Sequence, residues 1–472
     1  MRLRGRLNVG SQEFEAIIVG GGPAGLAVLL SAHKSGRLSE LLERGLLIVE
    51  RGDRIGQGKI GQYVINSDST GTTFVDPLRV GSESALHDLL ETKVARRIAA
   101  AGAESVPLRD VGELMDLIGD ALRGIIGRYP RSAVETGCSA ESAQRLRDGS
   151  WELKVRHEDG RVRTARTRRL VLATGATQPK AKLERDTFGG APVVERWGAK
   201  LLQSGEVLAT GGLDRVAEHL RGKARPSVAI LGGSTSAMAV AHALLNRLPQ
   251  VRFEERGITL FHRRPLRVYY TSVAEALAEG YTEFTDEDLC PISQRVFRLA
   301  GLRLDSRELL MQLRGIGGRA PEPRMTMHRL NGDDSEALQR IDAADLVIAA
   351  LGYRPNALQL HDVQGSPIAL FASRGPSARL VDGECRVLDQ YGDPLPGVFG
   401  IGLAAGFVPH GRLGGEPSFS GQANGLWLWQ NDIGSMIVDA MLPEPSLRRR
   451  KAACADSTTM LFNIRSEEAA IA

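Results

Sequence analysis

The feature that most constrains the fold is a glycine-rich segment between two short apolar stretches. Residues 14–19 read FEAIIV, which is typical of a buried strand, and residues 26–32 read LAVLLSA, which is typical of a helix. The intervening GGGPAG places a G-x-G-x-x-G pattern in the strand, turn and helix context of a dinucleotide-binding unit. Gly20 allows the sharp turn, Gly22 lets the backbone approach a pyrophosphate, and Gly25 lets helix and strand pack closely. The predicted cofactor contacts in this segment are Gly20, Gly22, Pro23, Ala24 and Gly25.

A second strand supports the same interpretation. Residues 46–49 read LLIV and are followed by Glu50. A carboxylate at the end of the second strand can accept hydrogen bonds from both ribose hydroxyls of a nucleotide. The complete set of strand, motif, helix, strand and acid is far more specific than the glycine pattern alone. Glu50 and the adjacent Arg51 are therefore also predicted to bind the cofactor.

A second glycine-rich turn lies near the middle of the chain. Residues 227–231 read SVAIL, and residues 232–237 read GGSTSA before another helical stretch. Ser234 stands where a middle glycine is usual, and its hydroxyl can donate to a phosphate oxygen. The predicted nucleotide contacts in this turn are Gly232, Ser234, Thr235 and Ser236.

The strand after this turn ends in basic residues instead of an acid. Residues 257–261 are followed by His262, Arg263 and Arg264. Two guanidinium groups in the place where a carboxylate would bind a 2′-hydroxyl favour a 2′-phosphate. Arg263 and Arg264 therefore predict NADPH over NADH, and a pair of surface arginines on a loop is the alternative.

Two similar strand endings flank the second glycine-rich turn. Residues 169–175 read RLVLATG, and residues 345–352 read DLVIAALG. Such strands return a chain from one nucleotide-binding unit to the next, so their positions imply that one domain is inserted into the other. We predict an α/β protein with two Rossmann-like dinucleotide-binding domains. The predicted segments are residues 1–184 and 345–472 for the first domain and residues 185–344 for the inserted one, with Gly175 and Gly352 as further cofactor contacts.

Charge and hydropathy exclude several other classes of protein. The net charge is +4, from 60 basic and 56 acidic residues, without a basic stripe carrying interleaved aromatic residues, so we expect no nucleic-acid partner. No apolar run has the length of a membrane span, and no apolar segment follows the N-terminal arginines as in a secretory signal. We expect a cytoplasmic protein whose basic run at residues 448–451 is a solvated tail.

The cysteines do not suggest redox or metal chemistry. Cys138, Cys290, Cys385 and Cys454 are far apart, and none belongs to a C-x-x-C pair. This pattern is typical of reduced, structural thiols. We therefore expect neither a local redox dithiol nor a metal site.

Taken in order, these motifs resemble the flavoproteins with two dinucleotide-binding domains, which implies FAD in the first domain and NADPH in the second. The chain resembles especially the NADPH-dependent flavin monooxygenases that N-hydroxylate lysine or ornithine. Residues 232–237 are similar to the second nucleotide motif of that branch, although its Gln-Ser-Ala ending is Thr-Ser-Ala here. Residues 345–353 resemble its ATGY strand with Leu351 in place of Thr, and residues 61–78 loosely resemble its flavin-contacting stretch. The Baeyer–Villiger fingerprint is not visible.

A second branch, related to thioredoxin and glutathione reductases, fits less well. Those enzymes place a dithiol beside the flavin and usually carry Gly-Asp in a late strand. Here residues 397–406 read GVFGIGLAAG, so Gly402 and Leu403 stand at the equivalent place and are predicted cofactor contacts. An NADPH-dependent reductase without a dithiol remains the alternative, and a non-catalytic flavin-binding sensor ranks third.

The resemblance implies that NADPH reduces the flavin and that oxygen then forms a C4a-hydroperoxyflavin, which oxygenates a small molecule such as an amine. The predicted catalytic residues are Gln62, on the resemblance, and Lys59, for which a solvated loop lysine is the alternative. The expected partners are a small-molecule substrate and molecular oxygen, and a homo-oligomer is left open.

Two further segments bear on the substrate. Residues 267–299 do not fit the nucleotide fold, and they carry four acids between Glu283 and Asp288. These acids either hold a cationic amine or form a solvated helix face. Residues 418–430 resemble a closing helix whose N-terminus would stabilise an anionic reduced flavin.

Overall fold

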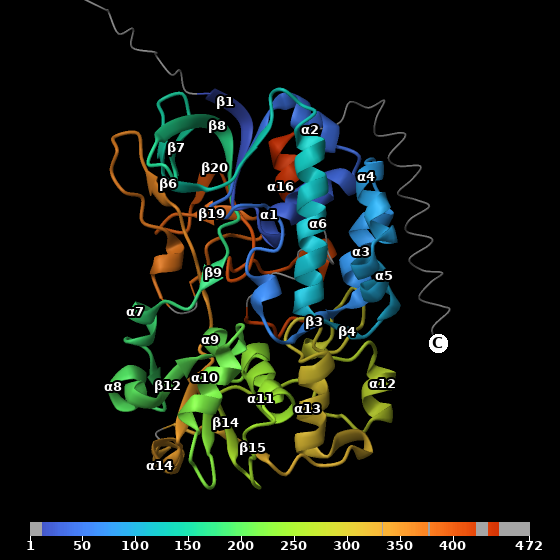
Figure 1. Cartoon of the computed structure of the whole chain (residues 1–472), viewed down its shortest axis with the longest axis vertical. Coiled ribbons are helices and arrows are strands. Elements are labelled where there is room, and N and C mark those ends of the chain that lie inside the picture. Colours follow the sequence, from blue (N-terminus) through green and yellow to red (C-terminus); the bar gives the residue numbers. More distant parts are fainter. Residues whose placement is uncertain (1–11, 333, 376–377, 422–432, 443–472) are drawn as a thin grey trace, which may run out of the picture.

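The computed structural model describes residues 12–332, 334–375, 378–421 and 433–442. These residues form two α/β units, which lie one above the other in Figure 1. The upper unit is built around a nine-stranded sheet and the lower one around a five-stranded sheet. The chain leaves the first sheet, builds the second and returns to the first. The predicted fold, with one dinucleotide-binding unit inserted into the other, is therefore confirmed.

The first sheet has the parallel centre that a dinucleotide-binding unit requires. β1 (Gln12–Val19) lies between β2 (Leu46–Val49) and β8 (Val162–Leu172) and pairs with both in parallel. All four residues of β2 are buried, which explains why this strand reads as a continuous apolar run. The other strands of this sheet are β5 (Ala133–Glu135), β6 (Cys138–Arg145), β7 (Trp151–His157), β18 (Gln359–His361), β19 (Arg386–Leu388) and β20 (Pro394–Gly400).

Helix α1 (Pro23–Lys34) begins directly after the first glycine motif. Pro23 occupies the first helical position, where a missing N–H costs nothing because that group has no partner within the helix. α1 is buried along most of its length and packs against α16 (Gly434–Met441). The other helices of this unit are α2 (Leu38–Arg44), α3 (Gly71–Arg79), α4 (Ser84–His87), α5 (Lys93–Ala100) and α6 (Leu108–Ile126).

The second sheet is parallel throughout, in the order β12, β16, β13, β14, β15. Its central strand β13 (Val228–Leu231) is fully buried and leads into α11 (Thr235–Arg247). The other strands are β12 (Leu201–Gln203), β14 (Ile258–His262), β15 (Met325–Arg329) and β16 (Leu346–Ala349). The other helices are α7 (Lys180–Leu183), α8 (Val193–Trp197), α9 (Ser204–Leu208), α10 (Gly212–His219), α12 (Val273–Ala278), α13 (Leu304–Arg314) and α14 (Ser335–Ala343).

The predicted domain boundary at residue 344 needs a correction. It assigns β16 to the first unit, whereas β16 pairs with β12 on one side and β13 on the other. A strand enclosed by two neighbours of one sheet belongs to that sheet, so the second unit extends to Ala349. The boundary at residue 184 stays a proposal.

The two chain segments that connect the units run side by side. β9 (Ala176–Thr177) and β17 (Arg354–Pro355) pair in antiparallel fashion. Beside them, the backbone N–H of Asn356 donates to the carbonyl oxygen of Gly175 at 2.9 Å, and its side-chain amide donates to Thr174 at 3.0 Å. The exit and the return of the chain therefore form one double-stranded connection.

A small two-stranded sheet lies where the units meet. β3 (Asn66–Thr70) pairs with β4 (Ser105–Pro107), and Figure 1 shows both between the lower end of α6 and the top of α13. β3 packs against α13, although the two are far apart in the sequence. This contact brings the segment after the first glycine motif onto the second unit.

Several predicted features lie outside the described residues. They are residues 422–430 of the expected closing helix, the basic run at residues 448–451, and Cys454. Within the described ranges, no helix combines the length and apolar character needed to cross a membrane.

Candidate active site

The first glycine motif forms a turn that leaves no room for side chains at two positions. Gly20 has a φ of +107°, and a Cβ there would overlap the carbonyl oxygen of Ala173. A Cβ on Gly25 would overlap the carbonyl oxygen of Gly20. By contrast, the nearest atom to a Cβ on Gly22 is the Cα of Gly58, at 3.6 Å. The turn is thus closed toward the sheet and open at Gly22, as the binding of a pyrophosphate requires.

Glu50 is held in place at the end of β2 by backbone groups. Its Oε2 accepts from the N–H of Gly21 at 2.6 Å, and its Oε1 accepts from the N–H of Gly52 at 2.7 Å. Each carboxylate oxygen has a second lone pair, which leaves acceptor capacity for ribose hydroxyls. The next residue, Arg51, is exposed. The acid is therefore fixed beside the glycine turn, where the prediction needs it.

Two later segments approach the same turn. A Cβ on Gly58 would lie 3.2 Å from the Cδ of Pro23, so the loop after Glu50 passes over the start of α1. Gly402 has a φ of +125°, and a Cβ there would lie 3.2 Å from the Cβ of Ala24. The late turn therefore reaches the N-terminus of α1, and its side chain at Leu403 is 40% exposed. This arrangement brings the predicted cofactor contact Gly402 next to the predicted contact Ala24, although the two lie at opposite ends of the chain.

The two predicted catalytic residues lie on the loop that follows Gly58. Lys59 immediately precedes a short 3₁₀ turn (Ile60–Gln62), and the side chains of Lys59 and Gln62 are both exposed. The carbonyl oxygen of Gln62 accepts from the N–H and the hydroxyl of Thr210, at 2.8 and 2.9 Å. These backbone contacts fix the loop against the second unit and leave both side chains available to a ligand. Their catalytic role stays a prediction.

The second glycine motif has the same construction. Gly232 has a φ of +133°, and a Cβ there would overlap the carbonyl oxygen of Ala350 at the end of β16. Ser234 is the exposed residue that precedes α11, and its hydroxyl makes no capping hydrogen bond to the helix. Thr235 and Ser236 form the first turn of α11, whose free N–H groups attract anions.

The arginine pair lies next to this motif. A Cβ on Gly233 would lie 2.9 Å from the Cβ of His262, so the end of β14 borders the glycine turn. Arg263 and Arg264 follow at once and are exposed. The imidazole Nδ1 of His262 lies 2.8 Å from the carbonyl oxygen of Arg264, which holds the arginine segment against the strand end. Both arginine residues therefore lie on the segment that follows the strand end beside the second glycine turn, and their contact with a 2′-phosphate stays a prediction.

The glycines of the two strand endings lie on the connection between the units. Gly175 and Gly352 have φ values of +69° and +89°, and a Cβ on either would meet no atom within 4 Å. Their positive φ values serve the turns, and the space beside both glycines is open. Their contact with a cofactor stays a prediction.

The excursion at residues 267–299 docks onto the late segment of the first unit. Asp288 is buried, where it accepts from Arg267 at 2.7 Å and from the hydroxyl of Ser418 at 2.6 Å. Glu283 forms an ion pair with an arginine of α13 at 2.6 Å. These two acids are occupied by protein cations, which favours a structural role over the binding of an amine.

A different acid, which the sequence analysis missed, stands without a partner. Asp68 lies on β3, and Arg303 directly precedes α13 on the opposite side of the junction between the units. Burial raises the pKa of Asp68 to about 7 even though Arg303 lowers it. No local pattern could reveal this pair, because its two residues come from distant parts of the chain.

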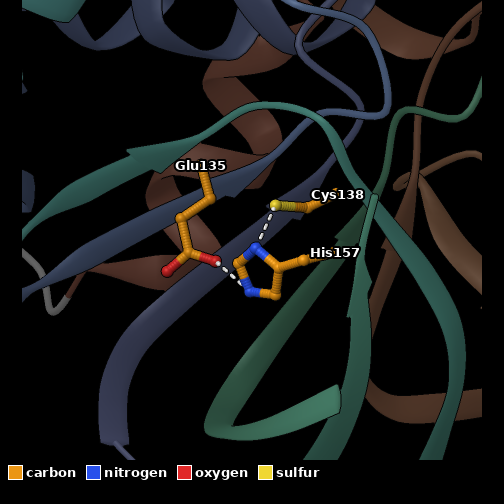
Figure 2. A group of neighbouring side chains, drawn as sticks. All are labelled: Glu135, Cys138 and His157. Carbon is orange, nitrogen blue, oxygen red and sulfur yellow. Dashed lines mark hydrogen bonds and ion pairs between the residues drawn. The ribbon is translucent and has the colours of Figure 1, made fainter. Parts of the chain in front are cut away.

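Figure 2 shows three residues of metal-ligand type in the first sheet, Glu135, Cys138 and His157. Cys138 Sγ lies 3.1 Å from His157 Nδ1, whereas Glu135 lies 3.9 Å from the other ring nitrogen. An ion bound to Sγ and Nδ1 would have to draw Glu135 away from Arg163, which donates to both carboxylate oxygens. Burial also raises the pKa of the Cys138 thiol. The group fits a hydrogen-bonded network better than a metal centre.

This network supports the first nucleotide site. The N–H of Cys138 donates to the carbonyl oxygen of Glu50 at 3.0 Å, and that of Gly137 donates to Gly52 at 2.8 Å. The turn between β5 and β6 therefore holds the end of β2.

The fold and these sites define a class of protein, the oxidoreductases that carry two dinucleotides on separate Rossmann-like units. Residues 14–402 match the pyridine nucleotide-disulphide oxidoreductase family, and the chain belongs to it. The three cysteines within the described residues are free, so none of them forms the disulphide for which the family is named.

Three individual proteins are similar to this chain. The chain is 34% identical to a CMP-5'-(3-aminopropyl)phosphonate hydroxylase of Streptomyces rubellomurinus, over 91% of this chain and 97% of the relative. A cadaverine monooxygenase of Erwinia amylovora, solved with bound FAD, is 12% identical with a TM-score of 0.54, covering 91% of this chain and 96% of that one. An L-lysine 6-monooxygenase of Pseudomonas syringae is 16% identical with a TM-score of 0.49, covering 91% and 99%.

The family and the hydroxylase relative confirm the predicted resemblance: the protein is a flavin-dependent oxidoreductase of the monooxygenase class. FAD and NADPH, the cofactors that family membership implies, agree with the sequence-based prediction. The structure of the cadaverine monooxygenase, with its TM-score of 0.54, supports the fold.

Proposed function

We propose that the protein is an FAD-dependent, NADPH-using monooxygenase that oxygenates the amine nitrogen of a small molecule. The observation that carries this proposal is the 34% identity, over 91% of the chain, to a hydroxylase whose substrate name contains a primary aminopropyl group. An unprotonated amine nitrogen is the most nucleophilic atom of such a molecule, and flavin-bound oxygen is electrophilic. We therefore expect the nitrogen to receive the oxygen, through a C4a-hydroperoxyflavin.

The proposed substrate class is an aminoalkyl phosphonate carried on a cytidine nucleotide. Support comes from the extent of the similarity to the hydroxylase, which covers 97% of that relative. An alignment of this length includes the nucleotide motifs and the segments between them. The substrate combines a cationic amine with anionic phosphorus groups, and the protein must match both charges.

The residues of the chain divide the binding tasks. FAD supplies the chemistry, because it accepts a hydride from NADPH and in its reduced form reacts with oxygen. The open backbone at Gly22 and the fixed carboxylate of Glu50 would hold its pyrophosphate and ribose. Lys59 and Gln62 extend from the adjoining loop and would contact the flavin or the substrate.

The second site would hold NADPH. Ser234 and the N-terminus of α11 offer donors to the pyrophosphate, and Arg263 and Arg264 stand beside that turn as ligands for a 2′-phosphate. Gly233 packs against the strand that carries the arginines, which supports one continuous nucleotide site.

Rapid mixing tests the proposal. Holoenzyme reduced with NADPH is mixed with oxygenated buffer, with and without CMP-5'-(3-aminopropyl)phosphonate, while flavin absorbance is followed and products are analysed by mass spectrometry. We expect a near-ultraviolet intermediate before oxidised flavin, and a product that has gained one oxygen atom on nitrogen. Single-step reoxidation that releases all the oxygen as hydrogen peroxide, with or without substrate, would contradict oxygenation.

The alternative is a reductase that passes electrons from NADPH to a small or protein acceptor. Membership in a family named for disulphide reductases favours it. It requires NADPH oxidation to run to completion without oxygen when a quinone or disulphide acceptor is supplied. Molecular oxygen as co-substrate, a homo-oligomeric state and a cytoplasmic location stay predictions from the sequence.

A further inference from the structure

Asp68 is a partly buried acid to which the fold gives no partner. It is partly buried on β3, and its carboxylate makes no hydrogen bond or ion pair with any described residue. Burial raises the pKa of Asp68 to about 7; Arg303 opposes this increase and Asp305 adds to it. Removing a carboxylate from water without a compensating hydrogen bond is costly. The carboxylate of Asp68 therefore has no partner within the protein and is available to a ligand.

Arg303 is the cation opposite Asp68. Its Nη2 donates to the carbonyl oxygen of Arg298 at 2.5 Å, and its guanidinium carbon lies 4.0 Å from the centre of the Tyr269 ring. Burial lowers the pKa of Arg303, and no carboxylate among the described residues forms an ion pair with it. A guanidinium has several N–H donors, so one backbone contact leaves others available to an anion.

The polar neighbours of this pair are satisfied, in contrast to Asp68. Asp305 accepts from the side-chain amide of Asn66 at 2.8 Å and from the hydroxyl of Ser105 at 3.0 Å. Arg247 donates to the side-chain oxygen of Asn66 at 2.8 Å. These contacts lock β3 and β4 onto α11 and α13. They hold the pair at fixed positions on either side of the junction between the units.

The junction is reached by the chain segment that leaves the first glycine motif. From Gly58, which borders Gly22, the chain passes Tyr63, whose hydroxyl lies 3.5 Å from that of Tyr353 on the connection between the units. It then enters β3, which Figure 1 shows directly above α13 of the second unit. Asp68 therefore belongs to the segment that leaves the FAD motif and meets the NADPH unit.

We propose that Asp68 and Arg303 bind the two charged ends of a zwitterionic substrate, Asp68 taking the ammonium group and Arg303 an oxygen of the phosphonate. This inference rests on the proposed function and names the residues that select its substrate class. The two residues lie on segments that pack against each other, because β3 contacts α13 and Asn66, two residues before Asp68, bonds to Asp305, two residues after Arg303. No ion pair joins Asp68 to Arg303 among the described residues. A short aminoalkyl chain that carries opposite charges at its ends would complete both sites.

The raised pKa of Asp68 also suits the reaction. A bound ammonium group must release one proton before its nitrogen can be oxygenated. A carboxylate of raised pKa accepts a proton more readily than a solvated one.

Calorimetric binding to the oxidised holoenzyme tests the proposal with two probes. One is CMP-5'-(3-aminopropyl)phosphonate, and the other is CMP-5'-propylphosphonate, which lacks only the amine. Asp68→Asn keeps the size of the side chain and removes its charge. We expect this substitution to lower the affinity for the amino probe by roughly 10- to 100-fold, as for the loss of a hydrogen bond to a charged group. The affinity for the other probe should stay unchanged. Arg303→Gln should lower the affinities for both probes by similar factors.

Asp305→Asn is the matched control, since Asp305 lies at the same junction but already accepts from Asn66 and Ser105. It should leave the ratio of the two affinities unchanged. An equal effect of Asp68→Asn on both probes would overturn the inference.

The pH dependence separates recognition from a structural role. The wild-type affinity for the amino probe should rise between pH 6 and 8 as Asp68, whose pKa is about 7, ionises, and this rise should vanish in Asp68→Asn. The other charged groups at the junction do not mimic it. Arg247, Arg303, Asp305 and His242 face the same junction. Burial lowers the pKa of His242 from its usual value near 6.5, and the rise in affinity should persist in the Asp305→Asn control.

The two proposals can fail separately. If the wild-type enzyme oxygenates the amino probe and Asp68→Asn still binds it normally, this inference is wrong and the proposed function stands. If the wild-type enzyme does not bind the probe, both this inference and the proposed substrate class are wrong.

Discussion

Replacing Asp68 with Asn is expected to stabilise the holoenzyme at pH 8 and to leave its stability unchanged near pH 3. The pKa of Asp68 rises from 3.8 to about 7 on folding, chiefly through burial. One pKa unit corresponds to about 1.4 kcal/mol, so the ionised carboxylate costs the folded state up to about 4 kcal/mol above pH 7. Asn has the same shape, carries no charge and avoids this cost.

The direction of the pH effect follows from the raised pKa. Well below pH 4 the carboxyl is protonated in both the folded and the unfolded chain, so it adds no cost. Between pH 4 and pH 7 only the unfolded chain ionises, and the wild-type protein loses stability as the pH rises. Above pH 7 the loss is complete. The free energy of unfolding of the variant should therefore exceed that of the wild type by an amount that grows as the pH rises from 4 to 7.

Thermal unfolding of both proteins with saturating FAD, measured at several pH values from 4 to 8, checks this expectation. The difference in Tm should grow to several degrees at pH 8 and shrink toward zero at the acid end. A variant that is no more stable at pH 8, or equally stabilised at every pH, would refute the conclusion that Asp68 is a buried acid without a partner. Asp305→Asn should lower Tm instead, because it disturbs the contacts to Asn66 and Ser105.

Further predictions concern the nucleotide sites and the docked excursion. Replacing both Arg263 and Arg264 with Ala should raise the KM for NADPH roughly 10- to 100-fold, since charged hydrogen bonds to the 2′-phosphate are lost; an equal rise for NADH would contradict that contact. Gly25→Ala should abolish FAD retention, read as the flavin-to-protein absorbance ratio, because its Cβ would overlap the Gly20 carbonyl. The control Gly124→Ala, in an open position of α6, should retain FAD and gain about 1 kcal/mol. The buried carboxylate of Glu416 accepts from the backbone N–H groups of Leu299 and Ala300, at 3.0 and 2.7 Å, where the excursion ends. Glu416→Ala leaves these N–H groups without their partner and should lower the free energy of unfolding by about 2–3 kcal/mol in denaturant titrations; no change would mean that the excursion is not anchored there.

Local patterns were enough to predict the two nucleotide-binding turns. The strand expected at residues 14–19 is β1 (Gln12–Val19), and the strand expected at residues 46–49 is β2. The second motif likewise connects β13 to α11. These predictions succeeded because a tight turn between a buried strand and a helix demands particular residues at adjacent positions. Insertion of one unit into the other followed from the order of these motifs.

The assignment of β16 shows where sequence order stops being informative. Residues 345–352 were expected to begin the return to the first unit, but their apolar run pairs within the second sheet. The sequence of an apolar strand does not specify which strands it pairs with. Pairing is decided by which sheet has room for a buried strand between two others.

The candidate substrate site depended on the tertiary structure alone. Four acids near Glu283 drew attention because they are adjacent in the sequence, yet Asp288 is engaged by Arg267 and Ser418. Asp68 and Arg303 gave no signal, since each is unremarkable among its own neighbours. The order of residues is enough to define the backbone turns, because the requirement there is steric and local. Only the folded chain decided which charges are buried without partners, because burial and ion pairing are set by residues that are distant in sequence and close in space.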